Sequence, residues 1–147
     1  LQVKQLLQKI ELNLKIHLHN SINKINKETD IYLINSYGKT KSFFKICKTV
    51  FLGGSLIKHG GQNPLEAARY GCKIIHGPNV RNFYDIYNLL NKYGVSRKVN
   101  NSNQMPYIID KIFKNKDSSK NIKSNIKNLG NKILYSTLNE INFFINK

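Results

Sequence analysis

Apolar and polar residues follow recognisable periods in the first third of the chain. Residues 14–18 alternate apolar and polar side chains, and residues 30–34 form a second short apolar run, so each predicts a β-strand. Residues 3–12 place apolar side chains at helical spacing and predict a helix. Residues 40–47 predict a further short helix.

The middle of the chain repeats this alternation. The short apolar runs 49–52 and 73–75 predict buried strands, and residues 95–99 predict an edge strand. Residues 64–70 and 82–93 between them predict helices. Strands that alternate with helices favour right-handed βαβ units, so we expect an α/β fold with a Rossmann-like parallel sheet flanked by helices.

Residues 104–113 predict another helix, and residues 118–146 predict one or two more. No apolar run reaches the roughly 20 residues that a bilayer span requires. The chain begins with Leu rather than Met, and we expect it to be part of a longer protein.

The chain carries a formal net charge of +16. Its basic residues are 21 lysines and 3 arginines, whereas proteins that read nucleic acids depend on arginine for bidentate contacts. Dense lysine therefore indicates a solvated surface, and we expect no nucleic-acid partner. Cys47 and Cys72 are isolated among apolar residues, which predicts reduced, buried thiols and no metal site.

One run of the sequence is typical of a ligand site. Gly53, Gly54, Gly60 and Gly61 follow a predicted strand and precede a predicted helix, so a ligand can approach the backbone closely. Asn63 is suited to cap that helix and Pro64 to its first position, where free N–H groups attract anions; Lys58 and His59 add positive charge. We therefore predict a phosphate site here. An alternative is a capping box, in which Glu66 only satisfies the Asn63 N–H.

A second loop follows one βα unit later, at residues 76–83. Because ligands bind at the C-terminal ends of parallel strands, we expect this loop to lie beside the first. Asn82 is expected to cap the next helix, and Arg81 to contact a phosphate or carboxylate. The alternative is that Arg81 and Asn79 are simply exposed.

Two motifs at this interval carry a family resemblance. Residues 53–71 read GGSLIKHGGQNPLEAARYG, and residues 77–83 read GPNVRNF. Over residues 14–99 the chain resembles the donor-binding half of the 3-deoxy-D-manno-octulosonic acid (Kdo) transferases, two-domain glycosyltransferases of the GT-B class. Residues 35–39 are similar to the Asp-Thr-x-Gly-Glu segment of the family, although Asn35 and Lys39 replace its acidic residues, so only Ser36 and Gly38 carry over.

The resemblance implies a metal-independent, inverting transfer of Kdo from CMP-Kdo to a lipid A precursor, at the cytoplasmic face of the bacterial inner membrane. It implies no cofactor and a peripheral membrane contact. Residues 1–113 would bind the donor and residues 114–147 would form a C-terminal helical segment. The donor-binding residues that the resemblance implies are Gly53, Gly54, Ser55, Asn63, Glu66, Gly77, Pro78 and Asn82. Lys58, His59 and Arg81 would be further anion contacts. Glu66 would hold the ribose hydroxyls.

The acceptor site and the general base of the family belong to an N-terminal domain that this chain does not contain, so we expect no catalytic residue here. Gln62 stands where the family often has His, and because Gln does not titrate we expect no acid role there. Two alternatives stay open: a donor domain for another nucleotide sugar, and a non-enzymatic basic module for nucleic acid or anionic lipid. The region around Phe143 and Phe144 either touches a membrane surface or packs on the partner domain, as is typical of GT-B proteins.

Overall fold

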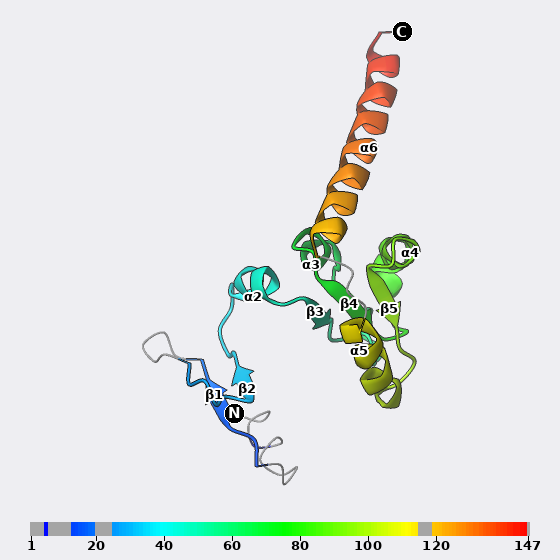
Figure 1. The fold of residues 1–147 in the computed structure, drawn as a ribbon. Helices are drawn as coiled ribbons and strands as arrows, with labels where there is room; N and C mark the ends of the chain where they lie inside the picture. Colours follow the sequence, from blue (N-terminus) through cyan, green and yellow to red (C-terminus); the bar gives the residue numbers. More distant parts are fainter. Residues whose placement is uncertain (1–4, 6–12, 20–24, 115–118, 147) are drawn as a thin grey trace. The chain divides into compact units, whose positions relative to one another are not determined.

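A computed structural model describes residue 5 and residues 13–19, 25–114 and 119–146 (Figure 1). The chain divides into two compact units, Leu1–Thr40 and Lys41–Lys147. The helix predicted over residues 3–12 lies outside the described residues, apart from residue 5.

The first unit contains a two-stranded parallel sheet. Strand β1 (Ile16–Leu18) pairs with β2 (Ile31–Leu33), and Ile16 lies opposite Ile31. Both strands lie within the segments predicted from the alternation of apolar residues, which confirms these two predictions.

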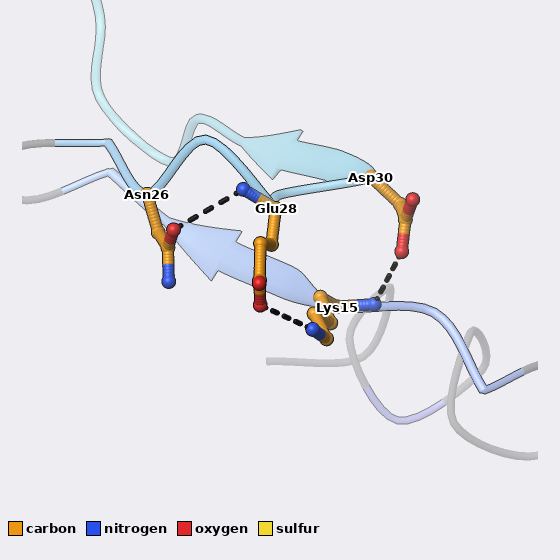
Figure 2. Close-up of polar contacts among 4 residues, drawn as sticks. All are labelled: Lys15, Asn26, Glu28 and Asp30. Atoms are coloured by element: carbon orange, nitrogen blue, oxygen red, sulfur yellow. Dashed lines mark hydrogen bonds and ion pairs between the residues drawn. The ribbon is translucent and has the colours of Figure 1, made fainter.

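Polar contacts join the beginnings of these two strands (Figure 2). The Lys15 N–H donates to Asp30 Oδ2 at 2.8 Å, and the Lys15 ammonium pairs with the Glu28 carboxylate. The Glu28 N–H donates to Asn26 Oδ1 at 3.1 Å and shapes the turn before β2. These side chains are exposed, so each contact adds little to stability and serves mainly to hold the register.

The second unit is built on a three-stranded parallel sheet. Strands β3 (Thr49–Phe51), β4 (Lys73–His76) and β5 (Ser96–Lys98) lie in the order β3-β4-β5, so β5 is at an edge as predicted. The parallel α/β arrangement predicted from the alternation of strands and helices is confirmed.

Helices connect and cover these strands. They are α2 (Thr40–Ile46), α3 (Leu65–Arg69), α4 (Tyr84–Lys92), α5 (Met105–Lys114) and α6 (Ser119–Ile145), with single 3₁₀ turns at η1 (Arg81–Phe83) and η2 (Ser102–Gln104). The region predicted to hold one or two C-terminal helices is thus a single helix of 27 residues.

The side chains of adjacent residues of β4 point to opposite faces of the sheet. Ile74 packs into a cluster with residues of α3, α4 and α6, whereas Ile75 packs with Val99 and Ile112 under α5. This division follows from the two-residue period of a strand, which sends successive side chains to opposite faces. The second unit therefore has three layers, with α3, α4 and α6 on one face of the sheet and α5 on the other.

Both cysteines are free thiols, as expected. Cys72 is buried, its thiol donates to the carbonyl oxygens of Phe44 and Cys47 at 3.4 and 3.1 Å, and burial raises its pKa to about 11. A thiol with so high a pKa is largely protonated near neutral pH and is a poor nucleophile. Cys47 is only half-buried, so the expectation that both thiols are buried is wrong for Cys47.

Helix α6 packs on α3 through its N-terminal part, where Ile122 and Ile126 are buried. Beyond Gly130 its side chains are exposed, and Figure 1 shows this part extending away from α3. Its exposed apolar residues are Ile133, Leu134, Tyr135, Leu138, Ile141, Phe143, Phe144 and Ile145. None of the helices in the described part of the chain is long and apolar enough to cross a bilayer.

Candidate functional site

The glycine-rich loop connects the C-terminal end of β3 to α3, where the sequence predicts it. Gly54, Gly60 and Gly61 have φ angles of +73°, +98° and +77°. L-residues with a side chain rarely adopt this region, so the path of the loop requires glycine at these positions. Gly53 does not require glycine in this way. Its φ is not in the left-handed region, and a Cβ built on it meets no atom within 4 Å.

Ser55 is the centre of a hydrogen-bond network that joins the two predicted loops. Its hydroxyl donates to the Leu52 carbonyl at 2.6 Å and accepts from the Gly77 N–H at 2.8 Å. Its carbonyl accepts from the Asn79 N–H at 2.9 Å and from Asn79 Nδ2 at 3.3 Å. Ser55 is fully buried, so its hydroxyl and its carbonyl serve contacts within the protein.

The two loops lie side by side, as predicted from their position one βα unit apart. A Cβ on Gly77 would lie 2.2 Å from the Ser55 carbonyl oxygen, and one on Gly61 would lie 3.1 Å from Val80 Cγ1. The backbones of the two loops are therefore in direct contact. Close approach, rather than an unusual φ, is what requires glycine at Gly77.

Asn82 does not cap the following helix, and this prediction is wrong. Helix α4 begins at Tyr84 after the 3₁₀ turn η1, its N-cap residue is Phe83, and no side chain caps it. The turn closes early because the Phe83 N–H donates to the Val80 carbonyl at 2.9 Å. Asn82 lies instead against Gly60, where a Cβ would come within 2.5 Å of its Nδ2. It therefore helps hold the second loop against the first.

Asn63 caps α3 as predicted. Its Oδ1 accepts the Leu65 N–H at 3.0 Å, and Pro64 already has helical angles, with φ −84° and ψ −13°. Regular helix begins at Leu65, one residue later than predicted. Because α3 has only five residues, its dipole is weak, and attraction for an anion there depends mainly on nearby cationic side chains.

Glu66 does not form the capping box. A bond from the Asn63 N–H to its carboxylate is not among the hydrogen bonds of the described residues. The carboxylate lies 3.7 Å from Lys41 Nζ, and the Glu66 side chain is 43% exposed, so it is open to a ligand. It lines a cavity of about 540 Å³ together with Lys41, Asn63, Leu65, Arg69 and Tyr70.

The remaining predicted residues lie on the surface of the loops. Lys58, His59, Pro78 and Arg81 are exposed. The ring of His59 covers Gly54, since a Cβ on Gly54 would lie 3.0 Å from His59 Cδ2. The structure thus brings together the residues of the two loops, while Glu66 and Asn63 face a separate cavity beside α2.

His76 is a polar residue of this region to which the sequence reasoning assigned no role. It ends β4 and is only 5% exposed; its Nδ1–H donates to the Gly77 carbonyl at 2.7 Å. Its ring centroid lies 4.2 Å from that of Tyr87, whose hydroxyl donates to the Gln62 carbonyl at 2.9 Å. One feature of the sequence could have pointed to this residue: a histidine directly follows the two isoleucines of a predicted buried strand and precedes a glycine.

Burial lowers the pKa of His76 below its ordinary value, and nearby Lys98 lowers it further, although the Gly77 carbonyl opposes this. The unfolded chain therefore takes up a proton at this position more readily than the folded one, so protonation favours unfolding. We expect the free energy of unfolding to fall as pH drops below about 6.5.

Thermal melting at about pH 7.5 and about pH 5.5 tests this expectation. His76→Gln should show a smaller difference between the two melting temperatures than the wild type. The control His59→Gln, at an exposed position, should keep the wild-type difference. Equal differences in all three proteins would contradict the prediction.

No protein-family model matches the chain. It is similar to 3-deoxy-D-manno-octulosonic acid transferase from Haemophilus influenzae, with 36% identity over 74 residues, which cover 50% of this chain and 17% of that enzyme. The Aquifex aeolicus transferase is 30% identical over 80 residues, which cover 54% of this chain and 23% of that enzyme. The matched stretch is thus less than a quarter of either relative.

A solved structure is similar in fold. The C-terminal CMP-Kdo binding domain of WaaA from Acinetobacter baumannii aligns with a TM-score of 0.74 and 22% identity, over 86% of this chain and 65% of that one. Its fold agrees with the Rossmann-like arrangement expected from the sequence. The chain is therefore similar to 3-deoxy-D-manno-octulosonic acid transferases in sequence and to the C-terminal CMP-Kdo binding domain of WaaA in fold, which confirms the resemblance drawn from its motifs.

Proposed function

We propose that this chain is the donor-binding half of a Kdo transferase and that it binds CMP-Kdo beside the C-terminal ends of β3 and β4. The observation that carries the proposal is the sequence similarity to Kdo transferases. In this chain the two loops also lie together at the C-terminal ends of the parallel strands. Ligands of open α/β sheets bind outside the C-terminal ends of the strands.

The charges around the loops suit this donor. CMP-Kdo carries a phosphodiester and a carboxylate, and the exposed Lys58, His59 and Arg81 stand on the two loops. Gly53 leaves its backbone open to a ligand, while Gly77, Pro78 and Asn82 would shape the neighbouring wall. We assign the phosphodiester to this surface, where the cations and loop N–H groups favour negative charge.

Glu66 would bind the ribose hydroxyls. Its carboxylate is not occupied by the Asn63 N–H and lies 3.7 Å from Lys41 Nζ, so its oxygens can accept hydrogen bonds from the hydroxyls of a ligand. Asn63 and Tyr70 line the same cavity of about 540 Å³. A carboxylate that accepts from two ribose hydroxyls has a parallel in dinucleotide-binding folds.

The complete enzyme would transfer Kdo to a lipid A precursor at the cytoplasmic face of the inner membrane, with inversion and without a metal. Its base would come from an N-terminal acceptor domain. This chain would then bind donor without catalysing transfer. The exposed apolar residues of α6 beyond Gly130 would pack against that domain rather than enter the membrane.

Titration of CMP into the chain, followed by ¹H–¹⁵N spectra, tests the proposal. We expect CMP to bind in preference to UMP, with shifts at Gly54 and Glu66 and only weak dependence on salt. Preference for UMP would indicate a donor domain for another nucleotide sugar. Binding of only a short oligonucleotide, abolished by salt, would indicate a non-specific polyanion module and contradict the proposal.

Glu66→Ala is expected to weaken CMP binding by about 1–3 kcal/mol, or about 5- to 150-fold in the dissociation constant. The reason is that two ribose hydroxyls lose their acceptor. The melting temperature should change little, because Glu66 makes only a half-exposed ion pair with Lys41. Glu140→Ala, at an exposed position of α6, is the matched control and should bind CMP as the wild type does. Unchanged affinity in Glu66→Ala would refute the assigned role.

A further inference from the structure

A buried tyrosine of α4, Tyr87, joins that helix to the glycine-rich loop. It is only 2% exposed and belongs to the core cluster that contains Ile74 and Leu90. The ring of a phenylalanine would fill the same space, but the Tyr87 hydroxyl donates to the Gln62 carbonyl at 2.9 Å. A buried tyrosine hydroxyl needs a hydrogen-bond partner, and here the partner is the backbone of the loop that precedes α3.

The sheet determines where the Tyr87 hydroxyl lies. The Tyr87 carbonyl accepts from the Ser96 hydroxyl at 3.0 Å, and Ser96 is fully buried at the beginning of β5. The Tyr87 ring centroid lies 4.2 Å from that of His76, the last residue of β4. Burial raises the pKa of Tyr87 to about 12, so its hydroxyl stays protonated near neutral pH and remains a donor.

The bond from Tyr87 sets the orientation of one peptide group in the loop. The described residues contain no cis peptide bond, and in a planar trans peptide the C=O and the N–H point in opposite directions. Because the Gln62 carbonyl is turned toward Tyr87, the N–H of Asn63 points away from α4. That N–H makes no hydrogen bond that joins it to another described residue.

This peptide group directly precedes the residues proposed to hold the donor. Gly60 and Gly61 come before it, with φ angles of +98° and +77°, and glycine has more conformational freedom to lose than any other residue. Asn63 and Glu66 come after it and line the cavity of about 540 Å³. An anchor at Gln62 orders this segment before a ligand arrives, so that binding does not have to supply the ordering free energy.

We propose that Tyr87 is a positioning residue of the donor site. By holding the Gln62 carbonyl, it keeps the Gln62–Asn63 peptide of the free protein in the orientation that the bound donor requires. Tyr87 acts through the loop backbone and does not itself touch the ligand. This inference rests on the proposed binding of CMP-Kdo and adds to that site a residue from the protein core.

Tyr87→Phe tests the role of the hydroxyl alone, because the ring and its contact with His76 remain. We expect the dissociation constant for CMP to rise about 3- to 10-fold, which corresponds to the net free energy of one hydrogen bond. Tyr84→Phe is the matched control, since it removes an exposed hydroxyl from the same helix. Its dissociation constant should stay within about twofold of the wild-type value.

A second control separates positioning from a general loss of stability. Ile112→Val removes one buried carbon atom from the cluster under α5, so it should lower the melting temperature while CMP affinity stays unchanged. The carbonyl ¹³C resonance of Gln62 should move in Tyr87→Phe, because its hydrogen bond is lost, and should stay in place in Ile112→Val. Equal losses of CMP affinity in these two variants would overturn the proposal.

Residual dipolar couplings in the wild type test the orientation itself and do not depend on whether Tyr87→Phe folds. They measure the direction of the Asn63 N–H relative to the N–H groups of β3, β4 and β5. We expect the same direction with and without CMP. A reorientation of this N–H on binding would show that the free loop is not preset and would overturn the proposal.

The CMP titrations distinguish a failure of this inference from a failure of the proposed function. Wild-type affinity in Tyr87→Phe would overturn the role of Tyr87 and leave the donor site standing. Absence of CMP binding by the wild type would overturn both.

Discussion

Gly77→Ala is expected to destabilise the fold by about 3–5 kcal/mol, the largest effect of any single substitution considered for the loops. The added Cβ would lie 2.2 Å from the carbonyl oxygen of Ser55 and 2.6 Å from the N atom of Leu56. Both are backbone atoms, so no side-chain rotation relieves the overlap. The loops must separate, which breaks the bond from the Gly77 N–H to Ser55 Oγ and the bond from the Asn79 N–H to the Ser55 carbonyl.

Gly53→Ala is the matched control for this substitution. A Cβ at Gly53 meets no atom within 4 Å, and its φ is not in the left-handed region. Its free energy of unfolding in urea should stay within about 0.5 kcal/mol of the wild-type value. If Gly77→Ala unfolds at the same urea concentration as Gly53→Ala, the loops are not in the contact described here. Failure of Gly77→Ala alone to fold would agree with the prediction.

Ser55→Ala is expected to lower the free energy of unfolding by about 2–4 kcal/mol. The substitution removes one hydroxyl that serves as donor to the Leu52 carbonyl and as acceptor for the Gly77 N–H. Both backbone groups then lack a partner in a position that excludes water, because Ser55 is fully buried. A buried polar group without a partner costs its full desolvation free energy.

Urea unfolding and amide hydrogen exchange measure this effect. The Gly77 amide of Ser55→Ala should exchange faster than in the wild type, because its acceptor is gone. Ser42→Ala, at an exposed position of α2, removes a hydroxyl of the same kind and should leave both measurements nearly unchanged. Equal stability of the two variants would show that the Ser55 hydroxyl does not join the loops.

These two substitutions separate structural from ligand-binding roles within the glycine-rich motif. The requirement for glycine at Gly77 and for serine at Ser55 follows from contacts inside the protein, with no ligand involved. Glu66 is different, since neither a capping box nor burial explains its carboxylate. The roles proposed for the donor site are therefore tested most directly at Glu66, and the geometry that supports the site is tested at Gly77 and Ser55.

Much of the architecture is determined by the sequence itself. Two-residue alternation at residues 14–18 and short apolar runs at residues 30–34, 49–52 and 73–75 predict β1 to β4, because a strand sends successive side chains to opposite faces. The Asn63 cap was also predictable, since its bond to the Leu65 N–H is local. The resemblance to Kdo transferases rests on the motifs of the two loops and needed no structure.

Contacts between residues far apart in the chain were decided only by the tertiary structure. Whether Gly77 needs to be glycine depends on Ser55, which lies 22 residues earlier, and local spacing carries no record of that approach. Asn82 was predicted to cap a helix, but the 3₁₀ turn and the contact with Gly60 determine its position. Local patterns specify which element forms, whereas packing between elements specifies which side chains share a site.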